Sequence, residues 1–171
     1  MTQSLLDALP VVSQIRRNHG LEHATMSVLA GNFQGLVMAG MSGPTGFVLF
    51  ADLPTETITD ATLEALERLQ EGEHELAVHP NCGTNLVASS VFSALAAWIV
   101  MAGTGKDDRL KLWRLPLALV VAVPVFFLSK PLGPWLQRLL TTSAIPGGMQ
   151  VGQVTTQKIN GKSVHHIITR F

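Results

Sequence analysis

The sequence predicts an α+β protein in which a small mixed domain is attached to a two-helix transmembrane hairpin. Of its 171 residues, 47% are hydrophobic and only 14% are charged, which is apolar for a soluble domain of this size. The mean hydropathy is +0.31, and most of it comes from uncharged stretches in the middle of the chain. We therefore divide the chain into an N-terminal α+β domain (1–85), a membrane hairpin (86–138) and a C-terminal β-hairpin (139–171) that packs on the first domain.

The first predicted element is a helix from Val12 to Ala30 that is closed by Gly31 and contains His19-Gly20-Leu21-Glu22-His23. Positions i, i+3 and i+4 of a helix point the same way, so both imidazoles and the carboxylate share one face. His-x-x-Glu-His is the inverted form of the zinc-peptidase helix motif. Two imidazoles on one face can bind a single divalent cation, with Glu22 beside it.

The same helical face is otherwise apolar, because it also carries Ile15, Met26 and Ala30, whereas Arg16, Arg17 and Thr25 fall elsewhere. Polar groups on an apolar face are costly to bury unless they are paired or bound to a metal. One interpretation is therefore a metal site. The alternative is a polar cluster satisfied by hydrogen bonds, in which Glu22 bonds a neighbouring helix and the imidazoles bond backbone carbonyls.

A second polar motif lies in the middle of the chain, where His79 and the single cysteine, Cys82, are three residues apart in a turn shaped by Pro80 and Gly83. Imidazole nitrogen and thiolate sulfur are the usual zinc ligands. Thr84 or Asn85 is expected to cap the apolar helix that follows. The site predicted from both motifs therefore contains His19, His23, His79 and Cys82 as metal ligands and Glu22 as the catalytic base. The alternative for Cys82 is a small buried residue without chemistry.

Together, His-Gly-x-Glu-His and His-Pro-x-Cys-Gly-Thr-Asn resemble an uncharacterised family of small bacterial membrane proteins, a domain of unknown function. They are also similar to a second uncharacterised family of multi-pass proteins with closely related boxes. The resemblance extends from Arg16 to about residue 130, and it implies a membrane location and a shared site without naming an activity. The similarity to inverted-motif metallopeptidases is confined to five residues. Those enzymes take a third ligand, usually Glu, from a downstream helix, and this sequence has no clear counterpart.

Two uncharged runs form the predicted hairpin. Leu86 to Gly103 is long enough to span a bilayer, and Leu115 to Leu128 is a shorter run interrupted by Pro116 and Pro124. Trp113 and Trp135 bracket the second run as interface anchors would. The alternative is a pair of buried core helices in a soluble protein.

Two spans place both polar parts on the same side of the membrane. The N-terminus lacks the features of a cleaved export sequence, which favours the cytoplasmic side. The positive-inside rule favours the opposite orientation, because the loop between the spans is basic. The residues responsible are Lys106, Arg109, Lys111 and Arg114.

The remaining elements are expected on either side of the hairpin, and the C-terminal pair carries a strong Asn-Gly turn signal. His165 and His166 are adjacent in that pair, so they face opposite sides and are expected to be half exposed. The predicted elements are strands at 34–41 and 45–50, a helix from Thr57 or Thr59 to Gln70 that is stopped by Gly72, a short strand from Glu75 to Val78, and strands at 149–158 and 162–170 joined by Asn160-Gly161.

Three functional hypotheses follow. The first is a membrane-bound zinc hydrolase, acting on a protein or peptide, in which His19, His23 and His79 hold one zinc ion per chain and Glu22 activates the bound water. The second is a closed structural zinc site that Cys82 completes. The third is a metal-free membrane scaffold or partner-binding module. The zero net charge and the lack of a phosphate-binding loop argue against nucleic acid and nucleotide as partners.

Overall fold

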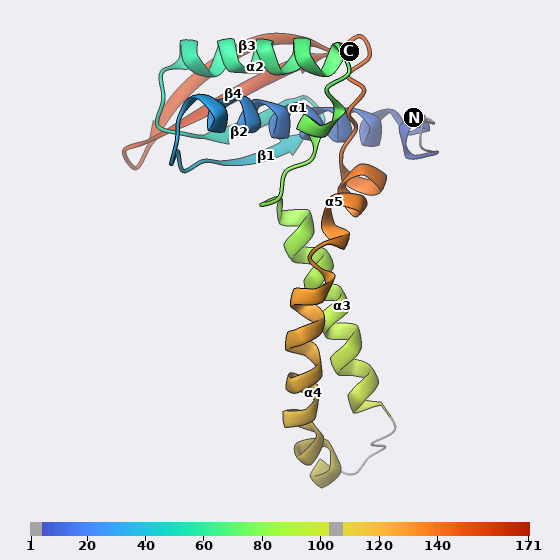
Figure 1. Ribbon diagram of the computed structural model, residues 1–171. Helices are drawn as coiled ribbons and strands as arrows, with labels where there is room; N and C mark the ends of the chain where they lie inside the picture. Colours follow the sequence, from blue (N-terminus) through green and yellow to red (C-terminus); the bar gives the residue numbers. More distant parts are fainter. Residues whose placement is uncertain (1–4, 103–107) are drawn as a thin grey trace. The chain divides into compact units, whose positions relative to one another are not determined.

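The computed structural model describes residues 5–102 and 108–171, which form two compact units. Unit 1 comprises the described residues up to His79 together with Arg138–Phe171, and unit 2 comprises Pro80–Gln137. Unit 1 contains a mixture of helices and an antiparallel sheet, and unit 2 consists of helices (Figure 1). The predicted α+β class is therefore confirmed, including its two long apolar helices.

In unit 1, helices α1 (Pro10–Asn32) and α2 (Thr55–Gln70) pack against one face of a four-stranded antiparallel sheet (Figure 1). The strands are β1 (Ala39–Gly43), β2 (Gly46–Phe50), β3 (Gln150–Ile159) and β4 (Lys162–Arg170), in the spatial order β1-β2-β4-β3. The core lies between these two layers. It includes Leu21 and Leu29 from α1, Ile58 and Leu69 from α2, and Leu49 and Ile167 from the sheet.

Helix α1 is longer at both ends than the sequence pattern suggests. Pro10 occupies its first turn, where the missing N–H of proline costs nothing, and the helix continues through Gly31 to Asn32. Helix α2 likewise begins at Thr55, earlier than the predicted Thr57 or Thr59, and it has Pro54 at its N-cap. The predicted end of α2 at Gln70 is confirmed, and Gly72 follows it with a positive φ of 101°.

Both predicted hairpins are present in the sheet. Asn160 and Gly161 form the turn between β3 and β4, as the sequence predicts. In the first hairpin the strand begins at Ala39 rather than at residue 34, and the turn consists of Pro44 and Thr45. Gly43 pairs with Gly46 across this turn, so the first strand ends two residues after its predicted end at residue 41.

The short strand predicted at Glu75–Val78 is wrong, because His74–Ala77 forms the 3₁₀ helix η2. This segment does not pair with either edge strand of the sheet. Instead, Ala77 is buried against the core, and the backbone N–H of Val78 bonds the carbonyl of Glu75. The segment is therefore satisfied by a local turn.

Unit 2 is built on the antiparallel helices α3 (Gly83–Met101) and α4 (Asp108–Ser129), which lie side by side (Figure 1). The short α5 (Leu132–Leu136) follows, and a π-helical turn, η3 (Gln137–Thr141), leads back into unit 1. Helix α4 runs through both Pro116 and Pro124 without a break. The predicted end of the first span, Gly103, and the basic residue Lys106 lie outside the described residues.

Two segments in unit 2, Gly83–Met101 and Lys111–Ser129, are long and apolar enough to cross a membrane. Each has 19 residues, which corresponds to about 28 Å of helix and matches the hydrocarbon core of a bilayer. Only 6% and 11% of their residues are buried, whereas the core helix of a soluble protein hides most of its apolar side chains. Their exposed apolar surface is consistent with contact to lipid.

The hairpin arrangement leads to the first testable expectation. Single cysteines introduced at the exposed residues Glu73 and Lys158, in a Cys82→Ser background, should react with a membrane-impermeant maleimide from the same side of sealed vesicles. Labelling from opposite sides would require an odd number of spans between them.

Candidate metal centre

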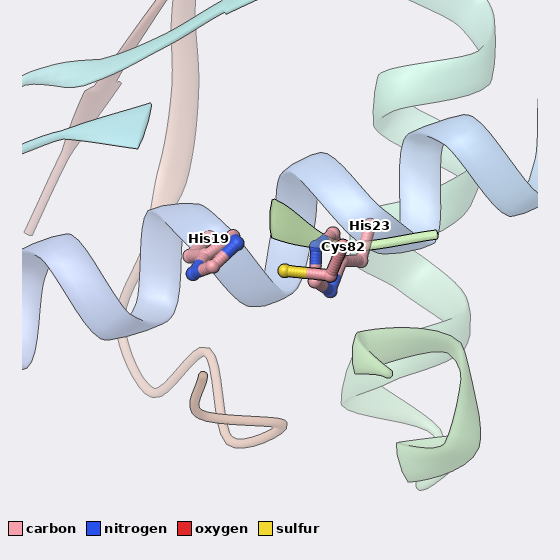
Figure 2. Close-up of side chains that lie close together, drawn as sticks. All are labelled: His19, His23 and Cys82. Atoms are coloured by element: carbon pink, nitrogen blue, oxygen red, sulfur yellow. The ribbon is translucent and has the colours of Figure 1, made fainter. Parts of the chain in front are cut away.

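Helix α1 places His19 and His23 one turn apart, with their ring centroids 4.3 Å from each other (Figure 2). A third imidazole from the same unit, His79, has its centroid 5.8 Å from that of His23. Two imidazoles bound to one tetrahedral zinc ion have centroids about 5 Å apart, as follows from a Zn–N bond of about 2.0 Å. Each of these two spacings is therefore compatible with a pair of imidazoles on one metal ion.

Each α1 imidazole forms a hydrogen bond to a backbone carbonyl through Nδ1. His19 Nδ1 lies 3.0 Å from the carbonyl oxygen of Thr141, and His23 Nδ1 lies 3.0 Å from that of Ala77. A carbonyl oxygen can only accept, so each Nδ1 must carry a proton. In a neutral ring the lone pair is then on Nε2, which is the nitrogen that could bind a metal. This is the arrangement in which metal-ligating histidines are usually held.

His79 is half-buried, and burial lowers the pKa of its imidazole because the charged form is poorly solvated there. A neutral imidazole is the form that binds a metal. His79 follows the buried Ala77 by two residues, and the carbonyl of Ala77 is the partner of His23. The contact between η2 and α1 therefore positions two imidazoles at once.

The close approach of the returning chain to α1 depends on Gly20. A Cβ atom at this position would lie 2.2 Å from the carbonyl oxygen of Ser143, which is closer than atoms can pack. The N–H of Ser143 also bonds the carbonyl of Arg16 at 2.9 Å. Gly20 thus lets the segment that supplies the Thr141 carbonyl lie directly on the helix.

Arg16 supports the same segment, although the sequence pattern placed it away from the polar face of α1. Its side chain is 4% exposed, and Nη2 donates to the carbonyls of Arg138, Leu139 and Thr142 at 3.1–3.3 Å. These carbonyls lie at the end of the π-helical turn, where helical partners are missing. The guanidinium of Arg16 therefore satisfies carbonyls of a segment that lies 122–126 residues later in the chain.

Glu22 is almost fully buried, at 4% exposed, and its carboxylate lies against β1. Oε2 accepts a hydrogen bond from Ser42 Oγ, and a Cβ atom at Gly40 would collide with Oε1. Burial raises the pKa of the Glu22 carboxyl, while the Ser42 bond and the nearby His19 oppose this shift. A carboxyl group with a raised pKa is suited to proton transfer near neutral pH. Ser42 and Gly40 were not predicted as site residues, because the sequence does not show which residues of a strand lie beside a helix.

Cys82 is the other candidate ligand. Cys82 belongs to unit 2, whereas His19, His23 and His79 belong to unit 1. Cys82 caps α3 in place of the predicted Thr84 or Asn85, and its sulfur accepts a bond from the backbone N–H of Thr84 at 3.4 Å. A helix N-terminus favours the thiolate form. Because only two residues lie between His79 and Cys82, their Cα atoms are at most about 11 Å apart.

The two C-terminal histidines have other roles. His165 is fully buried, which contradicts the expected half exposure, and both of its nitrogens are bonded within unit 1. Nδ1 lies 2.7 Å from Thr156 Oγ1, and Nε2 lies 2.9 Å from the carbonyl oxygen of Ala51. The neighbouring His166 is only partly buried. His165 is therefore a satisfied core residue.

The sequence comparisons place this architecture in a family. The model of a family described as a domain of unknown function, DUF6391, matches residues 14–154. The chain belongs to the DUF6391 family. The match includes both polar motifs and the two apolar helices of unit 2. The chain is also 29% identical to an uncharacterized protein of Picosynechococcus sp., over 95% of this chain and 83% of that protein. No solved structure matches the chain.

The carbonyl bonds predict the tautomers of this DUF6391 protein. When the rings are neutral and metal-free, two-bond ¹H–¹⁵N spectra should show His19 and His23 with a proton on Nδ1 and none on Nε2. His165 is an internal control, because its bond to Ala51 requires the proton on Nε2. The Nε2–H form at both α1 histidines would contradict the geometry of the site.

Proposed function

We propose that this DUF6391 protein is a membrane-bound, zinc-dependent hydrolase that cleaves peptides. In this proposal, His19, His23 and His79 hold one zinc ion and leave the fourth coordination position to water. Helices α3 and α4 anchor the protein in the bilayer. The polar segments before and after these two helices then lie on the same side of the membrane, which we take to be the cytoplasmic side. Zinc is favoured over other transition metals because it suits imidazole and thiolate ligands and needs no redox partner.

The observation that carries the proposal is the pair of Nδ1 bonds to the carbonyls of Thr141 and Ala77. A polar cluster without a metal can also place imidazoles on backbone carbonyls, but it does not require two neighbouring rings to donate through the same ring nitrogen. A metal site does need this, because both Nε2 lone pairs must be available to one ion. The ring of His79 lies 5.8 Å from that of His23, burial lowers the pKa of its imidazole, and it would supply a third ligand of the same kind.

Glu22 supports the hydrolytic form of the proposal. Zinc lowers the pKa of a bound water to about 7, and a nearby base must then accept its proton. Glu22 is the carboxylate on the same helix as both α1 imidazoles, and its interaction with His19 is strong enough to affect its pKa. The bond from Ser42 holds the carboxylate in one position, so little reorganisation is needed for proton transfer.

A closed structural site is the second candidate. The chemistry of Cys82 favours it, because a thiolate in the fourth position would leave no place for water. In that case Glu22 only orients an imidazole. The zinc ion would then tie α1 to the start of α3 and contribute to the stability of the fold.

Metal content tests both candidates. Protein purified without chelator should contain about one zinc ion per chain, and His23→Ala and His79→Ala should each lose it because the ligand shell is incomplete. His166→Ala is the matched control, since this residue lies in β4 and should leave the metal in place. Elemental analysis that finds no transition metal, even after zinc is added, would reject both candidates.

The role of Glu22 separates the two. In a hydrolase, Glu22→Gln should keep zinc affinity and melting temperature while peptide cleavage falls by about a hundred- to ten-thousand-fold. Gln can still accept the bond from Ser42, so the fold should persist. In a structural site the same variant should instead bind zinc about ten- to a hundred-fold more weakly and melt at a lower temperature. That second result would count against catalysis.

The sulfur of Cys82 can be examined directly with cobalt in place of zinc. A hydrolase with three imidazole ligands should show cobalt d–d bands without a sulfur-to-cobalt charge-transfer band, and Cys82→Ala should leave the spectrum unchanged. An intense charge-transfer band that disappears in Cys82→Ala would establish the closed site.

A further inference from the structure

Strand β1 lies at one edge of the sheet and touches the candidate base directly. The strand order is β1-β2-β4-β3, so among the described residues β1 has a paired neighbour on one side only. Two residues of this strand meet Glu22, since Ser42 donates to its carboxylate and Gly40 leaves room for it. The open edge of the sheet is therefore next to the proposed reaction site, within unit 1.

The pairing register shows which backbone groups face this edge. Gly43 and Gly46 close a two-residue turn and form a hydrogen-bonded pair. Hydrogen-bonded and non-bonded pairs alternate along an antiparallel ladder, so Met41 also bonds β2, whereas Gly40 and Ser42 do not. The N–H and C=O groups of Gly40 and Ser42 consequently point away from β2. The two residues next to Glu22 are thus the two that offer backbone donors and acceptors at the edge.

The two edges of the sheet differ in how they are protected. Strand β3 has a register irregularity between Val151 and Val154, carries Lys158, and bonds α2 through Thr156 and Thr55. Bulges, charges and covering elements are the usual devices that stop an edge from pairing. The sequence of β1, Ala39 to Gly43, contains no charge and no proline. Its small residues allow another backbone to approach closely.

We propose that β1 binds an extended peptide, which pairs with Gly40 and Ser42 as a fifth strand and so presents its backbone to the site beside Glu22. Binding at β1 does not require the protein to be a hydrolase; only the role of the bound peptide as substrate rests on the proposed function. Strand addition gives affinity through main-chain bonds and is tolerant of side chains. The five residues of β1 span about 16 Å, which is the reach of a short peptide.

The test uses the full-length, zinc-loaded protein in nanodiscs and a fluorescein-labelled hexapeptide of alternating valine and threonine. Fluorescence anisotropy should show saturable binding that empty nanodiscs lack. Two further peptides carry N-methyl groups, one on alternate residues and the other on every residue. The fully methylated peptide should bind at least tenfold more weakly, because it has no N–H group left to pair with β1, while the alternately methylated peptide keeps one free edge and should bind like the parent.

The matched protein variants are Ser42→Pro and Ser42→Ala. Both remove the hydroxyl that bonds Glu22, but only proline also removes the N–H at the open edge. Proline is tolerated where the N–H of an edge strand faces outward, so β1 should persist. Peptide affinity should fall about five- to tenfold in Ser42→Pro relative to Ser42→Ala. If Ser42→Pro does not fold, the comparison of the two N-methylated peptides still decides.

Equal binding of the two N-methylated peptides, equal affinity of the two Ser42 variants, or absence of peptide binding would each overturn the edge site. Conversion of a dimer to a monomer by Ser42→Pro, without peptide binding, would overturn it in favour of pairing between two copies of the chain. Cleavage is measured separately on the same peptides. If the peptides bind through β1 but are not cleaved, the peptide site is retained and the hydrolase is rejected. If they are cleaved equally with and without free N–H groups for pairing, the hydrolase is retained and the edge site is rejected.

Discussion

The arrangement of unit 1 depends on the need to satisfy polar groups that α1 carries into the core. His23 is 3% exposed, and its Nδ1–H bonds the carbonyl of Ala77, while His19 bonds that of Thr141. An imidazole buried without such a partner costs several kcal/mol, on the order of 2–4. These bonds fix two chain segments that are far apart in sequence, since Ala77 precedes unit 2 and Thr141 follows it. The same bonds set the tautomer that a metal requires.

Several other residues support the packing of these segments and of β1 against α1. Gly20 allows the returning segment to touch α1, and Arg16 satisfies the carbonyls at the end of its π-helical turn. Gly40 leaves space for Glu22, and Ser42 donates to it. The buried face of α1 carries more polar groups than a buried helix face usually does. These two glycines make room for that face, and the two polar side chains form hydrogen bonds beside it. Buried polar groups that neighbouring residues satisfy in this way are typical of functional sites.

Features governed by local rules were predicted well from the sequence. The Asn160-Gly161 hairpin depends on residues within the turn, and the apolar helices depend on continuous runs of hydrophobic side chains. The helix that carries His-x-x-Glu-His was also predicted, because its periodicity is local.

Features governed by contacts between distant segments were not predicted. The burial of Arg16 follows from carbonyls more than 120 residues away, and the bond from Ser42 to Glu22 follows from the way β1 lies on α1. Glu75–Val78 has the composition of a strand, but the sheet has no place for it, so it forms η2. The backbone acceptors of His19 and His23 have no signature in the sequence at all, because every residue carries a carbonyl.

The most direct measurement of the central claim is X-ray absorption spectroscopy at the zinc edge of the intact, zinc-loaded protein. The account predicts nitrogen ligands at about 2.0 Å with the multiple-scattering pattern of at least two imidazoles, which His19→Ala should reduce by one. A sulfur contribution at about 2.3 Å would identify the closed form of the site without removing the imidazoles. A shell of oxygen ligands alone, or a spectrum unchanged in His19→Ala, would contradict a metal centre on α1.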